Sequence, residues 1–194
     1  MTSSLVGSEM CIRDSDKPVT RQEIFKAIDE NFKSIRHGRI GRKGVLGFFN
    51  TKTDAVRVRN YGDFEAAAHE LGHYLDKYFE FTTKKHQAEL VGNVHRRFGG
   101  RYDKLDSTGL AKEGFAEFYR DYTTNRARAK ADFPEFYDEF TSRLKAAPEL
   151  NARVEKVSAV MHQWYRQDPH ERIKGTVTSV SYTHLRAHET RRHL

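Results

Sequence analysis

The sequence of 194 residues predicts an α+β domain that is mostly helical, with a short β-hairpin or small sheet ahead of its central helix. Two observations support this prediction. Apolar residues recur at helical spacing through most of the chain, and only two neighbouring runs, 45–49 and 55–59, resemble strands. The next expected helix carries the pattern H-E-x-x-H at residues 69–73, around which the other elements are organised.

The first element is a helix expected near 21–35. Thr20 and Glu23 have the spacing of a capping box, in which each side chain accepts a hydrogen bond from the other residue's backbone. One face of this helix is apolar and comprises Ile24, Phe25, Ile28, Phe32 and Ile35. The Gly- and Arg-rich segment 36–44 is interpreted as a charged loop, although its four basic side chains would also suit a phosphate.

A hairpin is expected next. The run 55–59 alternates apolar and basic residues, as a half-buried strand does, and residues 50–54 suit the turn between the two runs. An exposed edge of this sheet could hold an extended peptide through main-chain hydrogen bonds. A purely structural hairpin fits the same pattern equally well.

The central helix is expected to begin after Asp63, a favourable N-cap residue. Its apolar stripe comprises Phe64, Ala68, Leu71, Leu75 and Tyr78. His69 and His73 lie one turn apart on another face, so both can bind one metal ion, with Glu70 placed to take a proton from a water that the metal activates. The alternative is a surface helix with two solvated histidines.

The second half of the chain is expected to be helical. A helix near 84–98 should end at Gly99, with His86 and His95 at the surface. A helix near 109–123 buries Ala111, Phe115, Phe118, Tyr119 and Tyr122. Asp132 is the expected cap of a further helix whose buried face is Phe133, Phe136, Phe140 and Leu144. The last helix, about 148–166, carries the stripe Leu150, Val154, Val157, Met161 and Trp164.

Glu113 and Glu117 lie one turn apart, away from the stripe of the 109–123 helix. By themselves they indicate an ordinary solvated acidic face. A site with two histidines lacks its third ligand, however, and a carboxylate from a later helix would supply it and leave a fourth position for water. The second carboxylate could accept a hydrogen bond from a ligand histidine. Spacing alone does not assign the two roles.

The 69–73 motif, followed by Glu113-Gly114-Phe115-Ala116-Glu117-Phe118, resembles the gluzincin class of zinc metallopeptidases. Within this class, the spacing and the aromatic-rich continuation resemble the catalytic domain of anthrax lethal factor and related phage-encoded domains, over about 45–144. The resemblance implies a zincin-like fold and one Zn²⁺ ion bound by His69, His73 and Glu113. It also implies that Glu70 is the general base and that Glu117 supports a ligand histidine.

One position departs from this family. Its catalytic tyrosine lies seven residues before the third ligand, where this chain has Asp106. The nearest upstream tyrosine, Tyr102, is therefore the candidate for stabilising the oxyanion.

The two ends are expected to lie outside the domain. Residues 4–15 and 180–190 resemble translated sequencing adapter known from metagenomic assemblies, so 1–15 and 180–194 are interpreted as artefactual tails with little packing. Flexible natural tails are the alternative. The predicted domain is 16–179, a fragment of a larger protein.

Composition excludes some classes of protein. Cys11 is the only cysteine, so 16–179 can form no disulfide. The absence of disulfides permits a reducing compartment, and a cytoplasmic site of action, with phage delivery as one route, is expected. The tails hold four of the 34 basic and three of the 27 acidic residues, which leaves a net charge of +6, but no aromatic-basic motif favours nucleic acid. No apolar run is long enough to span a membrane.

The main functional prediction is a zinc metalloendopeptidase that acts on a peptide or protein. The competing one is a zinc-binding but inactive interaction or scaffold module of a large phage-type protein. The sequence does not predict an oligomeric state.

Overall fold

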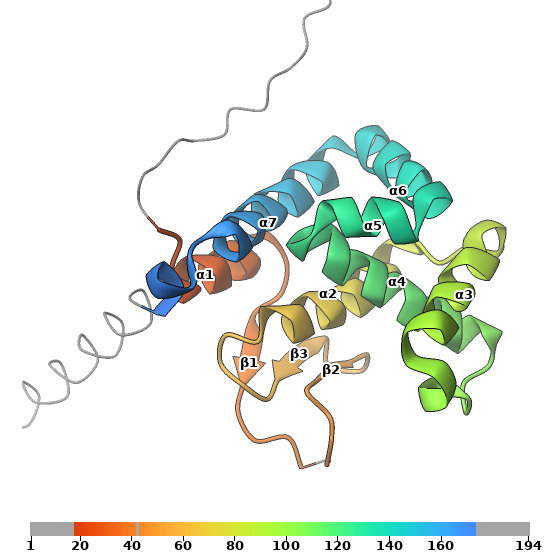
Figure 1. Cartoon of the computed structure of the whole chain (residues 1–194), viewed down its shortest axis with the longest axis horizontal. Coiled ribbons are helices and arrows are strands. Elements are labelled where there is room, and N and C mark those ends of the chain that lie inside the picture. Colours follow the sequence, from red (N-terminus) through yellow and green to blue (C-terminus); the bar gives the residue numbers. More distant parts are fainter. Residues whose placement is uncertain (1–17, 42, 174–194) are drawn as a thin grey trace, which may run out of the picture.

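The computed structural model describes residues 18–41 and 43–173 (Figure 1). Its elements are α1 Arg21–Asn31, β1 Ile35–His37, β2 Gly47–Asn50, β3 Ala55–Val58, α2 Phe64–Phe79, α3 Gln87–Phe98, α4 Ser107–Thr124, α5 Arg126–Asp132, α6 Pro134–Ala146 and α7 Pro148–Arg166. Two 3-10 helices, Lys84–His86 and Gly99–Tyr102, flank α3. The predicted α+β class, mostly helical with a small sheet before the long helices, is confirmed. The predicted tails lie outside the described residues.

The sheet has the strand order β1-β3-β2. β2 and β3 pair antiparallel, which confirms the predicted hairpin, and Asn50 accepts backbone hydrogen bonds inside its turn. β1 pairs parallel to β3, with Ile35 opposite Val56. β2 is thus an edge strand, and among the described residues none pairs with its other side.

The start of the chain differs from the prediction in one respect. The capping box of Thr20 and Glu23 is present, but α1 ends at Asn31 and Ile35 belongs to β1 instead of the helix. Segment 36–44 was expected to be a loop, yet its first two residues continue this strand. Only Ile35 of the three strand residues is buried. A strand this short has no alternating pattern to detect, and Ile35 reaches the core through sheet pairing rather than a helical face.

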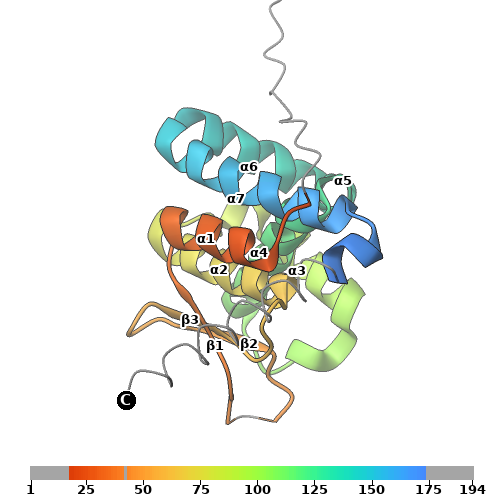
Figure 2. The same cartoon turned by 90° about the vertical axis from the view of Figure 1, so that its left-hand side faces the viewer.

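The centre of the molecule is the contact between α2 and α4, with α2 also packed on β2 and β3 (Figures 1 and 2). An added Cβ at Gly72 would lie 2.7 Å from the Cα atom of Ala116, so these helices approach too closely for a side chain there. The predicted stripes of both helices are buried, except at Tyr78, which is 48% exposed. Tyr78 lies near the end of α2, where its hydroxyl donates to Asp54 of the hairpin turn.

α4 also packs against α3, α5 and α7, and α6 and α7 lie side by side above α1 in Figure 2. The predicted buried faces of α6 and α7 are confirmed. Asp132, however, does not cap α6: Phe133 holds the N-cap position, and Asp132 ends the unpredicted helix α5 and pairs with Arg97. Helix α5 buries only Ala129, so it has no apolar stripe to reveal it.

His86, just before α3, and His95, within it, differ in their exposure to solvent. His95 is exposed, as predicted, whereas His86 was expected at the surface and is buried. Its ring lies edge-on to Phe136 of α6, which covers it. In the part of the chain that the structure describes, no helix is both long and apolar enough to cross a membrane.

Candidate metal centre

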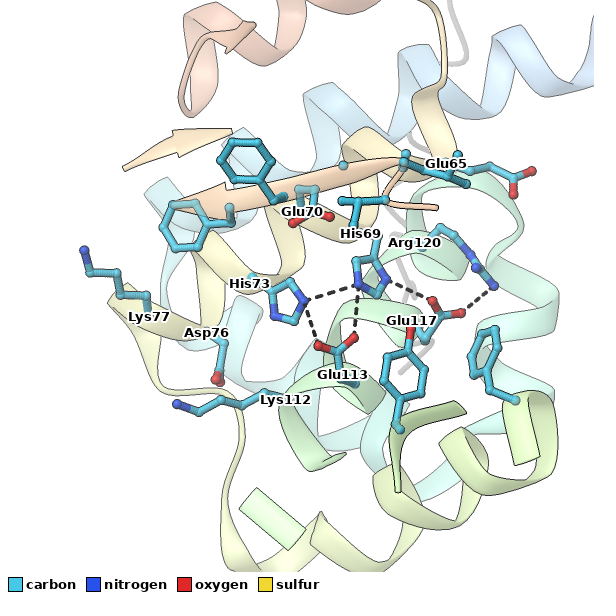
Figure 3. Close-up of a pocket in the computed structure, with 18 of the residues that line it drawn as sticks. Glu65, His69, Glu70, His73, Asp76, Lys77, Lys112, Glu113, Glu117 and Arg120 are labelled. Atoms are coloured by element: carbon cyan, nitrogen blue, oxygen red, sulfur yellow. Dashed lines mark hydrogen bonds and ion pairs between the residues drawn. The ribbon is translucent and has the colours of Figure 1, made fainter. Parts of the chain in front are cut away.

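Two helix starts determine where the polar side chains meet. The carboxylate of Asp63 caps α2 by accepting from the backbone N–H of Ala66, and Asp106 caps α4 by accepting from Gly109. From these starts both helices bury their apolar stripes, and their remaining faces meet beside β2. The histidines of α2 therefore face the glutamates of α4 (Figure 3).

Three side chains converge at this point. His69 Nε2 lies 3.2 Å from His73 Nε2 and 3.4 Å from Glu113 Oε2, and His73 Nε2 lies 3.6 Å from Glu113 Oε1. Two ligands of one tetrahedral zinc ion, each about 2.0–2.1 Å from the metal, are about 3.3 Å apart. These separations are close to that value, and one ligand atom from each of the three residues lies within 4.8 Å of the others, so the group could hold a metal ion.

Glu117 lies behind this group. Its Oε1 atom is 2.9 Å from His69 Nδ1, and its Oε2 atom is 2.7 Å from Arg120 Nη2 (Figure 3). A hydrogen bond from Nδ1–H to this carboxylate leaves the lone pair of His69 Nε2 directed toward His73 and Glu113. This is the arrangement by which a carboxylate orients a metal-binding histidine.

The protonation of the two histidines differs strongly. Burial lowers the pKa of His69, but hydrogen bonds to Glu113 and Glu117 outweigh it and raise this pKa to about 9. Burial and the adjacent His69 charge lower the pKa of His73 to about 4. Burial raises the pKa values of Glu113 and Glu117, but interactions with the histidines lower both overall. Without metal, His69 therefore holds an extra proton on Nε2, the atom that faces His73 and Glu113, and a metal ion bound there would displace that proton and free the Nε2 lone pair.

Glu70 lies between the two histidines in sequence and is only 7% exposed. Burial raises the pKa of its carboxyl to about 7, against the lowering effects of the His69 charge and a backbone hydrogen bond from Phe49 of β2. Gly47 of the same strand makes room for this carboxyl, since an added Cβ would lie 2.9 Å from Glu70 Cγ. A carboxyl with this pKa can both accept and release a proton near neutral pH.

These residues line a cavity of about 1080 Å³. Its walls come from residues 44–49, from the polar face of α2, and from Tyr102 and α4. Burial and the negative charge of Glu113 raise the pKa of Tyr102, so its hydroxyl keeps its proton. Asp106, where the resemblance would require a tyrosine, is an exposed N-cap residue and does not line this cavity.

A buried ionic network that the sequence analysis missed supports Glu117. Arg97 of α3 lies 3.5 Å from Glu117 Oε2 and also pairs with Asp121 and Asp132. Arg120 pairs with both Glu117 and Asp121. The i, i+3 spacing of Glu117 and Arg120 was a detectable signal, but the contribution of Arg97 from another helix was not.

Comparisons add no family assignment, because no protein-family model, no curated protein and no solved structure matches the chain. The structure provides a mostly helical domain with a small sheet and a His-His-Glu group that could hold a metal ion. The roles of Glu70, Tyr102 and Glu117, and zinc as the metal, stay predictions.

Proposed function

We propose that this chain is a zinc-dependent metalloendopeptidase. The observation that carries the proposal is the His69, His73 and Glu113 group on the wall of a large cavity, next to the buried carboxyl of Glu70. Three protein ligands leave one position of a tetrahedral zinc ion open, which distinguishes catalytic sites from closed structural ones. The resemblance of the two motifs to gluzincins supports the same conclusion.

Zinc bound there would lower the pKa of a water molecule and polarise the carbonyl group of a peptide bond. Glu70 accepts the proton of the attacking water on its carboxylate and delivers it to the nitrogen of the leaving amine. Burial, which raises the pKa of this carboxyl to about 7 in the metal-free protein, favours a group that can both take up and release a proton. Glu117 keeps Nδ1 of His69 protonated, so that Nε2 is available as a ligand.

The substrate is proposed to be an extended peptide. The cavity wall includes residues 44–49, which contain most of β2, and this strand is at an edge of the sheet. An edge strand can hydrogen-bond an added strand through its free N–H and C=O groups. Tyr102, which also lines the cavity, is the candidate donor to the oxyanion that forms from the peptide carbonyl.

The proposal is tested by hydrolysis of a mixed peptide library with zinc-loaded protein, with and without a chelator. Glu70→Gln should retain zinc but lose about 10²–10⁴-fold in rate, because the amide cannot accept the proton. Glu149→Gln, an exposed change on α7, is the matched control and should keep full activity. Zinc binding without any hydrolysis would instead favour the inactive interaction module.

A further inference from the structure

A second group of metal-ligating side chains lies where α3 meets the start of α6. One ligand atom from each of His86, Glu89 and Glu135 lies within 4.8 Å of the others. We propose that this group binds a second divalent metal ion, of the zinc type, which fastens α6 to α3. This site shares no residue with the first cavity, so it does not depend on the proposed peptidase activity.

His86 is the observation that points to a ligand. Its side chain is buried, with 5% of the residue exposed, and among the described residues neither ring nitrogen has a hydrogen-bond partner. Its nearest ionic neighbour, Glu139 Oε2, is 3.7 Å from Nε2, beyond hydrogen-bond distance. Leaving a buried polar group without a partner is unfavourable, and a metal bond to one nitrogen would remove part of that cost.

The two carboxylates are held in different ways. Glu89 accepts from two backbone N–H groups at the start of α6, those of Glu135 at 3.2 Å and Phe136 at 2.8 Å. These bonds fix the Glu89 carboxylate beside His86 and leave lone pairs on both oxygens. Glu135 is in the first turn of α6 and is exposed, so its side chain can close over the group from the solvent side.

The donor set and local charge select the kind of metal. One imidazole nitrogen and two carboxylate oxygens suit zinc and similar first-row ions, whereas calcium and magnesium prefer oxygen ligands alone. The positive end of α6 disfavours a cation, but the Glu89 carboxylate already occupies that end. Lys85 lies 3.0 Å from Glu139 and neutralises it, which leaves Glu89 and Glu135 to balance a divalent charge.

A metal ion here would stabilise the helix that supports α4. Phe136 of α6 packs against Phe115 and Phe118, with ring centroids 5.7 and 4.8 Å away. Both phenylalanines belong to α4: Phe115 lies between Glu113 and Glu117 in the sequence, and Phe118 directly follows Glu117. The second ion is therefore assigned a structural role, in which it holds the far side of the helix that supplies the first site.

The test separates the two sites by mutation. His69→Ala/His73→Ala removes the first site, and zinc titration by calorimetry should still find one equivalent bound. Adding Glu135→Ala should weaken that binding by about tenfold or more, because one of three ligands is lost. The matched control is Glu149→Ala, since Glu149 follows Pro148 at the start of α7 as Glu135 follows Pro134 at the start of α6. The control should bind zinc unchanged.

Circular dichroism first establishes that each variant is folded, and Glu113→Ala is the alternative background if the double histidine variant is not. A rise in melting temperature on zinc addition, present with the Glu149→Ala control and absent with Glu135→Ala, would support the second site. The proposal is overturned if the first-site variants bind no zinc, or if Glu135→Ala binds it as tightly as its control. The first result would leave His86 as a buried neighbour of Glu139, and the second would show that Glu135 is not a ligand. Loss of peptidase activity alone affects neither outcome.

Discussion

Truncation of Glu113 should abolish zinc binding at the first site, whereas truncation of Glu117 should mainly lower the stability of the protein. Glu113 has one oxygen near each histidine Nε2, at 3.4 and 3.6 Å, so Glu113→Ala leaves the first site with two protein ligands. We expect tight zinc binding at that site to be lost. Its side chain is 21% exposed, against 5% for Glu117, so its removal should destabilise the metal-free protein less than removal of Glu117 does.

Glu117→Ala should retain zinc but lose stability. Loss of a carboxylate that orients a ligand histidine typically costs about 10–100-fold in metal affinity or activity. Glu117 is 3% exposed, and its removal leaves Arg97 and Arg120 with fewer partners. Both arginines keep contacts to Asp121, so a loss of about 1–3 kcal/mol is expected instead of the larger cost of an isolated buried charge. In a domain of this size, each kcal/mol lowers the melting temperature by about 2–4 °C.

The assay is a competition titration of zinc against a chromophoric chelator, combined with thermal unfolding of the metal-free proteins. Glu117→Gln is the matched control, because its amide oxygen can still accept from His69 Nδ1–H and should preserve more affinity than alanine. The assignment would be refuted by the reverse pattern, in which Glu117→Ala abolishes zinc binding at the first site and Glu113→Ala retains it.

Three further predictions concern other parts of the chain. Gly72→Ala forces a Cβ to within 2.7 Å of the α4 backbone and should lower the free energy of unfolding, measured by chemical denaturation, by about 1–3 kcal/mol. Gly92→Ala, in open space on α3, is the control and should be neutral or stabilising. Equal effects of the two changes would contradict the close packing of α2 on α4. Tyr102→Phe should lower kcat and leave zinc affinity unchanged, and full activity in this variant would rule out its role at the oxyanion. Removing 1–15 and 180–194 should leave the melting temperature almost unchanged, because the described core runs from Val19 to Trp164; a large drop would refute the tail interpretation.

The spacing of apolar residues predicted the helices that are long and bury one apolar face. The stripes of α2, α4, α6 and α7 lie on helices of 13–19 residues, long enough to show their repeat several times. β1 and α5 have three and seven residues and bury one side chain each, so no repeat could reveal them. β1 depends on its pairing with β3, which lies farther along the chain, and α5 depends on its packing against the preceding helix α4 and on the ion pair of Asp132 with Arg97 of α3.

The candidate site was predictable to the extent that its residues lie close together in sequence. His69, Glu70 and His73 share one helix, and the i, i+4 spacing of the two histidines alone predicted that both face one metal ion. Spacing did not decide between Glu113 and Glu117, because that choice depends on how α4 packs against α2. The buried position of Glu70 under Gly47, and the support of Glu117 by Arg97, come from contacts between separate elements, which a single sequence does not encode as a pattern.

The most direct test is a crystal structure of the zinc-loaded protein, with diffraction data on both sides of the zinc absorption edge. We predict an anomalous peak about 2.0–2.1 Å from His69 Nε2, His73 Nε2 and one oxygen of Glu113, with a fourth position open to the cavity. Zinc-loaded crystals without a peak between these three residues would contradict the central claim.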